Sequence, residues 1–239
     1  MKIEILGTLI DQVDMASALQ KIETFIAEGI PHHVITLNAE IIYRAQFEPE
    51  LKAIINRAAL VTPDGAGVVW ASRYLKKPVP ERVTGIDLLQ AIAARASTTG
   101  WRLFLLGGAP GVAEEAAANL KKRFTNLNIV GTHHGYWPPT EEEAIVALIR
   151  SARPDVLFVA LGAPRQEYWI SRHLSVLGVP VCMGVGGSFD VLAGRVKRAP
   201  KWMQQLQLEW LARLVQEPFR WRRMLALPKF MFRVIRSKR

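Results

Sequence analysis

An aspartate in a glycine-rich turn is the feature of this sequence that most directly suggests chemistry. Asp64 follows the apolar run 58–61, which is typical of a short buried strand, and precedes a helical pattern that starts near Val68. In α/β folds, ligands bind at the carboxyl ends of the strands. Gly65 and Gly67 leave room for a substrate to approach the backbone. Asp64 is therefore a candidate ligand-binding carboxylate, and the alternative is that it only caps the helix.

Polar side chains also follow two other predicted strands. Thr36 and Asn38 alternate along the end of strand 33–38, so they point to the same side and suit a polar ligand. Asn38 fits equally well as the cap of the next helix. Gln166 follows strand 156–161, and its amide can donate and accept hydrogen bonds at once, as sugar hydroxyls require.

Two further segments could hold phosphate groups. Arg82 lies in a proline-stiffened loop just before a predicted helix, where a guanidinium can bind phosphate oxygens in two-pronged fashion, although most exposed arginines bind nothing. Gly107 and Gly108 follow a strand and precede a helix, which is the layout of a nucleotide-binding unit. The spacing matches neither G-x-G-x-x-G nor a P-loop, so it predicts neither a dinucleotide nor ATP, and a tight turn without a ligand stays open.

Strands and helices alternate along the chain, which predicts a Rossmann-like α/β fold with a mainly parallel sheet flanked by helices. The expected strands are 2–6, 33–38, 58–61, 101–106, 128–130, 156–161 and 181–185. The expected helices are 15–26, 39–47, 86–96, 112–124 and 141–150.

Neither a metal nor a cofactor is expected. The adjacent His133 and His134 have no Cys, Asp or Glu at ligand spacing nearby, and the sequence has no Asp-x-Asp pair. The lone Cys182 lies in an apolar run and fits a small buried hydrophobe in a reducing cytoplasm. No signal peptide is expected, and no window approaches the ~20 apolar residues of a membrane-spanning helix.

The positive charge is concentrated at the C-terminus. The whole chain carries a net charge of +10, but residues 195–239 hold 13 Lys or Arg against two Glu, a net of +11, which leaves −1 for residues 1–194. We therefore divide the chain into a core, residues 1–194, and a basic C-terminal appendage, residues 195–239. Aromatic and aliphatic residues recur at helical spacing in the appendage beside a basic face, which predicts amphipathic helices on an anionic membrane.

Several segments together resemble the WecG/TagA/CpsF family of bacterial glycosyltransferases. The similarity runs from about residue 3 to residue 225 in the family's order. The segments are Thr36-Leu37-Asn38-Ala39-Glu40, Thr62-Pro63-Asp64-Gly65, Glu81-Arg82-Val83-Thr84-Gly85, Leu106-Gly107-Gly108-Ala109-Pro110-Gly111, Leu161-Gly162-Ala163-Pro164-Arg165-Gln166-Glu167, Gly186-Gly187-Ser188-Phe189-Asp190 and Arg198-Ala199-Pro200.

The resemblance implies an inverting, metal-independent transfer of a sugar from a UDP-sugar to a polyprenyl-diphosphate-linked saccharide. The family's best-known member transfers N-acetylmannosamine to lipid-linked N-acetylglucosamine in wall teichoic acid synthesis, and relatives serve other surface polysaccharides. The protein would then be cytoplasmic and peripherally associated with the inner face of the cell membrane. The resemblance does not fix the sugar, and whether the chain forms a homo-oligomer stays open.

The resemblance also assigns roles to individual residues. Asp64 would be the general base on the acceptor hydroxyl, and Arg82 would contact the diphosphate, with Gly107 and Gly108 among the substrate-binding residues. The sugar site would be lined by Thr36, Asn38 and Gln166, and the active site would be completed by Arg213, Arg220 and Arg223.

Two other classes of protein stay as alternatives. A basic tail with tryptophans also suits nucleic acid, but the apolar residues of this tail are too many and too periodic for a solvated arm, so no nucleic-acid partner is expected. A nicotinamide-dependent oxidoreductase could use the glycine turn 107–111, but its spacing argues against one.

Overall fold

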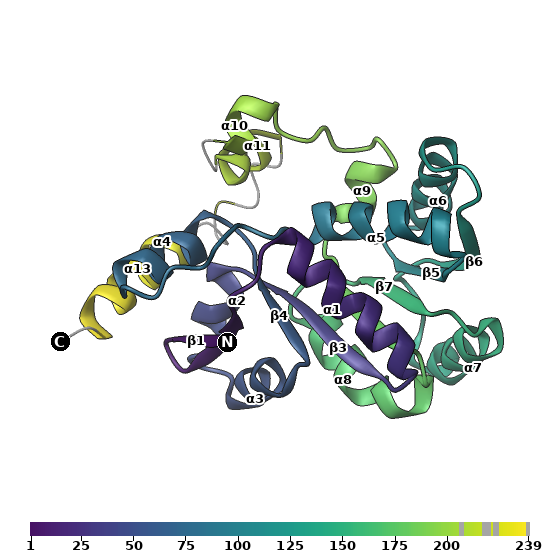
Figure 1. Cartoon of the computed structure of the whole chain (residues 1–239), viewed down its shortest axis with the longest axis horizontal. Helices are drawn as coiled ribbons and strands as arrows, with labels where there is room; N and C mark the ends of the chain where they lie inside the picture. Colours follow the sequence, from purple (N-terminus) through teal and green to yellow (C-terminus); the bar gives the residue numbers. More distant parts are fainter. Residues whose placement is uncertain (206–207, 217–220, 222–224, 238–239) are drawn as a thin grey trace.

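A six-stranded parallel sheet, in the order β4-β3-β8-β7-β5-β6, runs through the centre of the computed structural model and confirms the predicted fold class (Figure 1). The structure describes residues 1–205, 208–216, 221 and 225–237. The strands are β3 (His32–Leu37), β4 (Leu60–Pro63), β5 (Arg102–Gly107), β6 (Asn128–His133), β7 (Val156–Ala160) and β8 (Val181–Gly184). The chain leaves β3 and β5 toward opposite edges of the sheet, an arrangement that opens a crevice at the carboxyl ends of the strands.

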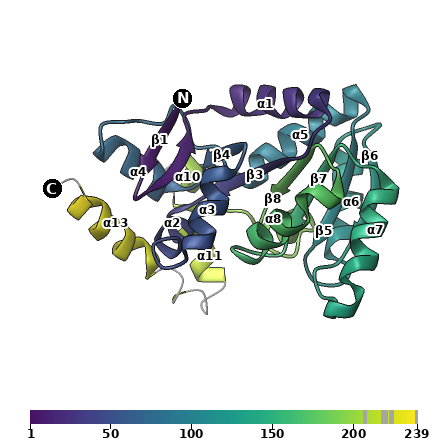
Figure 2. The ribbon, with the colours of Figure 1, turned by 90° about the horizontal axis from the view of Figure 1, so that it is seen from below.

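Helices cover both faces of the sheet because alternate strand residues point to opposite sides. On one face, Leu103 and Leu105 pack with buried residues of α1 (Met15–Glu28), α5 (Gly85–Thr99), α6 (Val112–Arg123) and α9 (Ser188–Leu192). Figure 2 shows α1 and α5 together on this side of the sheet.

On the opposite face, Phe104 and Leu106 pack against α7 (Glu142–Ala152) and α8 (Arg165–Leu177), with the short 3-10 turn η1 (Pro139–Glu141) leading into α7. The β3–β4 end of this face is covered by α2 (Ala39–Arg44), α3 (Pro49–Arg57) and α4 (Ala66–Tyr74).

Two elements near the N-terminus differ from the sequence predictions. The single strand expected at 2–6 is an antiparallel hairpin of β1 (Lys2–Ile5) and β2 (Thr8–Asp11), in which Leu6 and Gly7 both have positive φ and form the two-residue turn. The helix expected over 39–47 ends at Arg44, and α3, which we did not predict, starts at Pro49, a residue that favours the first turn of a helix.

The appendage contains three described helices, and the last of them packs on the core. They are α10 (Lys201–Gln205), α11 (Glu209–Gln216) and α13 (Ala226–Ser237). Phe230 and Val234 of α13 are fully buried in the cluster formed with α2 and α4. Gly67 of α4 permits this contact, because a Cβ there would lie 2.9 Å from Leu227 Cδ1 and 2.8 Å from Ala39 Cβ.

Side-chain packing thus joins the two sides of the composition boundary at residues 194/195, and the division into a core and a membrane-associating appendage stays a prediction. Among the residues that the structure describes, no helix combines the length and apolarity needed to cross a bilayer.

Candidate active site

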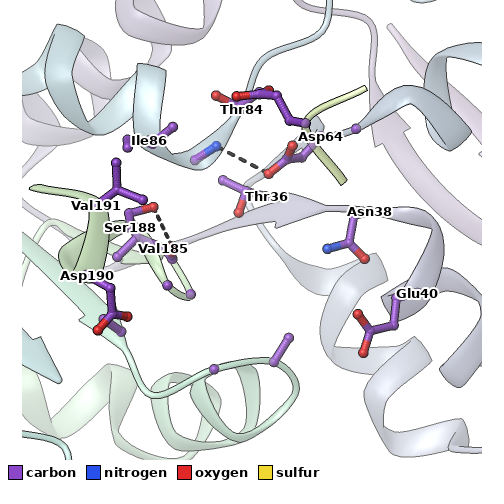
Figure 3. A pocket seen from close by; sticks show the side chains of 18 of the residues that line it. Thr36, Asn38, Glu40, Asp64, Thr84, Ile86, Val185, Ser188, Asp190 and Val191 are labelled. Atoms are coloured by element: carbon purple, nitrogen blue, oxygen red, sulfur yellow. Dashed lines mark hydrogen bonds between the residues drawn. The ribbon is translucent and has the colours of Figure 1, made fainter. Parts of the chain in front are cut away.

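A cavity of about 580 Å³ lies at the carboxyl ends of the strands, and both the core and the appendage line it. Figure 3 shows Asn38 and Glu40 on one side, Ser188 and Asp190 on the other, and Thr36 with Asp64 between them. The cavity brings together six of the predicted site residues: Thr36, Asn38, Asp64, Arg82, Gly108 and Gln166. The appendage contributes Lys197, Arg198, Ala199, Glu209, Trp210, Leu214 and Leu227.

Asp64 is fixed in the cavity by the main chain around it. Its backbone N–H donates to Leu37 O at 2.9 Å, which extends the β3–β4 pairing by one residue. One carboxylate oxygen accepts a hydrogen bond from the Gly85 N–H at 3.3 Å (Figure 3). The segment that carries Gly85 is held beside β4 by a bond from Val83 N–H to Pro63 O. Asp64 is therefore a half-buried, oriented carboxylate, and Arg82, from the segment that carries Gly85, lines the same cavity.

Thr36 and Asn38 both line the cavity, and both also support the backbone. The Thr36 hydroxyl donates to Gly184 O at 3.2 Å. The Asn38 side-chain oxygen accepts from Ile41 N–H at 3.0 Å, so the capping alternative is confirmed. Because the cap uses the oxygen, the amide nitrogen points to the cavity side (Figure 3). Asn38 thus caps α2 and also faces the cavity.

Gln166 is more deeply placed than the sequence suggested. Its side chain is buried, its oxygen accepts from Gly186 N–H at 3.0 Å, and its nitrogen donates to Glu167 Oε1 at 2.8 Å. A Cβ at Gly184 would lie only 2.6 Å from the Gln166 nitrogen, so this side chain packs directly on β8. Gln166 ties α8 to the turn after β8, and its predicted contact with the sugar stays a prediction.

Glu167, the neighbour of Gln166 in α8, is a buried carboxyl. Its side chain is fully buried, and its second oxygen has no hydrogen-bond partner in the described part of the chain. Burial raises the pKa of Glu167 to about 7, and the hydrogen bond from Gln166 offsets only part of that effect.

Arg82 and Arg198 meet one carboxylate of the appendage. Arg82 Nη2 lies 2.7 Å from Glu209 Oε2, and Arg198 Nε donates to Glu209 Oε1 at 3.2 Å. The two terminal nitrogens of Arg198 donate to Asp87 at 2.7 and 2.8 Å. Burial alone would raise the pKa of Asp87, but the hydrogen bonds from Arg198 and Thr84 and the nearby guanidinium charges lower it below its usual value.

The glycine pair is divided between two roles. Gly108 lines the cavity, whereas Gly107 has φ +127° and lies against β7, where a Cβ would be 2.4 Å from Ala160 O. Gly107 therefore allows β5 and β7 to approach each other closely. Its predicted contact with substrate stays a prediction.

Three predicted arginines cannot be placed. Arg220 and Arg223 lie outside the described residues, and Arg213 belongs to α11 although its side chain is not among those described. Their proposed completion of the site stays a prediction.

The lining residues that received no role in the sequence analysis include Tyr136, Asp190, Arg198 and Glu209. Arg198 and Asp190 lie in segments that carry the family resemblance, which is the signal that could have selected them. Tyr136 was visible only as an aromatic residue in a loop between a strand and a helix. Tyr136 is 69% exposed although it borders the cavity.

Comparison with known proteins assigns the class. Residues 3–239 match the Glycosyl transferase WecG/TagA/CpsF family, so the chain belongs to this family of glycosyltransferases.

Two relatives carry the same enzyme name, N-acetylglucosaminyldiphosphoundecaprenol N-acetyl-beta-D-mannosaminyltransferase. The one from Staphylococcus aureus (strain MW2) is 36% identical over 240 residues, covering 100% of this chain and 94% of its own. The one from Bacillus spizizenii is 35% identical over 227 residues, covering 95% of this chain and 88% of its own.

The buried Glu167 predicts a pH-dependent stability. Between pH 4.5 and about 7 the folded state keeps a proton that the unfolded state has released, so the free energy of unfolding falls as pH rises through this range. The variant Glu167→Gln cannot ionise and should lose this dependence. Relative to the variant, the wild type should lose roughly 3 kcal/mol across the range.

Urea unfolding at about pH 5 and about pH 8 measures the effect. The matched control is Glu143→Gln, which changes an exposed glutamate of α7 and should leave the wild-type pH profile intact. A Glu167→Gln variant that keeps the wild-type slope would show that this carboxyl does not titrate with the fold.

Proposed function

We propose that this glycosyltransferase moves N-acetylmannosamine from a UDP-sugar to a polyprenyl-diphosphate-linked N-acetylglucosamine, with inversion and without a metal. The observation that carries the proposal is the oriented Asp64 carboxylate in a cavity that also contains the Arg82 and Arg198 guanidiniums. A base and a phosphate-binding cation are the two groups that such a transfer needs. The choice of sugar and acceptor follows the names of the two relatives.

The chemistry is a single displacement at the anomeric carbon. Asp64 takes the proton of the attacking acceptor hydroxyl, and the hydroxyl oxygen forms the new glycosidic bond. The bond from the anomeric carbon to the UDP oxygen breaks, and its electron pair leaves on the diphosphate. Arg82 would stabilise the charge that develops there, which is the task a metal performs in other nucleotide-sugar enzymes. In the described part of the chain, no three His, Cys, Asp or Glu side chains gather as a metal site.

The acceptor's polyprenyl chain places the reaction at a membrane, and the appendage offers a surface for one. Trp221, Leu225, Phe232 and Ile235 are exposed, whereas Phe230 and Val234 of the same region are buried against the core. Basic residues of α13, among them Lys229 and Arg233, accompany the exposed apolar groups. Such a surface binds an anionic leaflet by apolar burial and by charge. We propose peripheral association with the inner face of the cell membrane in teichoic acid or related polysaccharide synthesis.

The base assignment predicts that Asp64→Asn lowers turnover by about two to four orders of magnitude, because the acceptor hydroxyl then keeps its proton. UDP affinity, measured by calorimetry on the same preparation, should change little because the carboxylate acts on the acceptor. Turnover is followed by mass spectrometry of the lipid-linked product. Near-normal turnover in the variant would remove Asp64 from the mechanism.

The membrane assignment predicts that replacing Phe232 and Ile235 together by Ser weakens binding to phosphatidylglycerol vesicles by about ten-fold or more, because two apolar side chains no longer insert. Deletion of the appendage is a poorer test, because it would also remove the buried side chains of Phe230 and Val234 from their packing against the core. Vesicle flotation at low and high salt measures the binding, which should weaken as salt rises.

The control for this test replaces two exposed apolar residues of the core, Leu148 and Val176, by Ser. Their exposed fractions, 47% and 50%, resemble those of Ile235 and Phe232, 45% and 64%. Equal flotation of the appendage variant and this control would contradict membrane docking through α13.

A further inference from the structure

Glu209 occupies a position in the cavity that suits an anionic substrate group. Its two carboxylate oxygens are divided between two guanidiniums, at 2.7 Å from Arg82 Nη2 and 3.2 Å from Arg198 Nε. All three residues line the cavity, and their side chains are only 15%, 24% and 22% exposed for Arg82, Arg198 and Glu209. Two guanidiniums that converge on one pair of oxygens form the geometry that binds phosphate as readily as carboxylate.

Arg198 is held in place without Glu209. Asp87 accepts hydrogen bonds from both terminal nitrogens of Arg198, and the hydroxyl of Thr84 donates to Asp87 Oδ2 at 2.6 Å. Thr84 in turn caps α5 and is buried. Arg198 Nε would thus stay directed into the cavity if the Glu209 carboxylate moved away.

The charges around the cavity favour a diphosphate that replaces the Glu209 carboxylate over one that binds in addition to it. The described lining residues include four cationic side chains, Arg82, Arg165, Lys197 and Arg198, and four anionic ones, Glu40, Asp64, Asp190 and Glu209. Formal charges therefore cancel before any ligand binds. A diphosphate added to this set would leave its charge uncompensated, and departure of Glu209 would free Arg82 and the Nε of Arg198 for it.

We propose that the Glu209 carboxylate occupies the binding site of the substrate's diphosphate, and that the diphosphate displaces it from Arg82 and Arg198. This inference rests on the proposed function and extends it to the appendage. Glu209 is the first residue of α11, and Trp210 and Leu214 of the same helix line the cavity. Displacement of the carboxylate therefore shifts α11, so that occupation of the site by phosphate is coupled to the position of the appendage.

A purely structural ion pair makes the opposite prediction. If Glu209 only anchored α11, removing its charge would loosen the appendage and leave anion binding equal or weaker. If Glu209 competes with the diphosphate, removing its charge strengthens anion binding. The sign of the change in affinity thus separates the two roles.

The test uses calorimetric titration of the full-length protein with two probes, UDP and inorganic pyrophosphate, at constant ionic strength. Glu209→Gln and Glu209→Ala should each bind both probes about ten-fold more tightly than the wild type, since the competing charge is gone. The matched control is Glu115→Gln. Glu115 accepts two hydrogen bonds from Arg195, also across the 194/195 boundary, but neither residue lines the cavity. This control should leave both affinities unchanged.

Pyrophosphate separates this inference from the proposed donor. Tighter pyrophosphate binding by both Glu209 variants supports displacement even if UDP fails to bind, an outcome that would count against a UDP-sugar donor alone. Pyrophosphate affinity that is unchanged, weaker or undetectable in the wild type and both variants overturns the inference.

Hydrogen exchange of the wild type supplies a second readout. Pyrophosphate should increase amide exchange in residues 208–216, because the ligand removes the contact that holds the start of α11. Unchanged or slower exchange in this segment would show that Glu209 stays in place, and it would also overturn the inference.

Discussion

The parallel pairing of β3 with its two neighbours is the constraint on which the site depends. The register of β3 with β4 aligns Thr36 with Thr62 and Leu37 with Pro63, which brings Asp64 beside the end of β3. The pairing of β3 with β8 carries Gly184 to the Thr36 hydroxyl. A slip of one residue in either pairing would turn the polar side chains away from the cavity. Main-chain hydrogen bonds therefore fix the geometry of the candidate base before any ligand arrives.

Electrostatics then join the core to the appendage. A nearly neutral core and a strongly basic appendage have little net attraction for each other. Two ion pairs nevertheless cross the boundary: Asp87 of the core with Arg198 of the appendage, and Arg82 of the core with Glu209 of the appendage. Apolar packing of Phe230 adds a second attachment at the other end of the appendage. With one attachment at the cavity and another beside it, the appendage can line the site and still present apolar groups outward.

The sequence predicted the features that depend on local patterns. Apolar runs gave the central strands, and the polar residues after them, such as Asp64 and Asn38, do line one cavity. The N-terminal hairpin was missed because its turn requires Leu6 at positive φ, which leucine rarely adopts. The contacts of Arg82 with Glu209 and of Arg198 with Asp87 could not be predicted, because residues far apart in sequence meet there through tertiary packing. Likewise, nothing local distinguishes Gly107, which packs on β7, from Gly108, which faces the cavity.

We propose that the protein transfers a sugar from UDP to a lipid-linked saccharide without a metal. The most direct measurement incubates the full-length protein with a panel of UDP-sugars, a synthetic polyprenyl-diphosphate N-acetylglucosamine and excess EDTA. We expect transfer of N-acetylmannosamine alone or in strong preference, with inverted anomeric configuration in the product. Absence of turnover with every UDP-sugar, or turnover that appears only when Mg²⁺ or Mn²⁺ replaces EDTA, would contradict it.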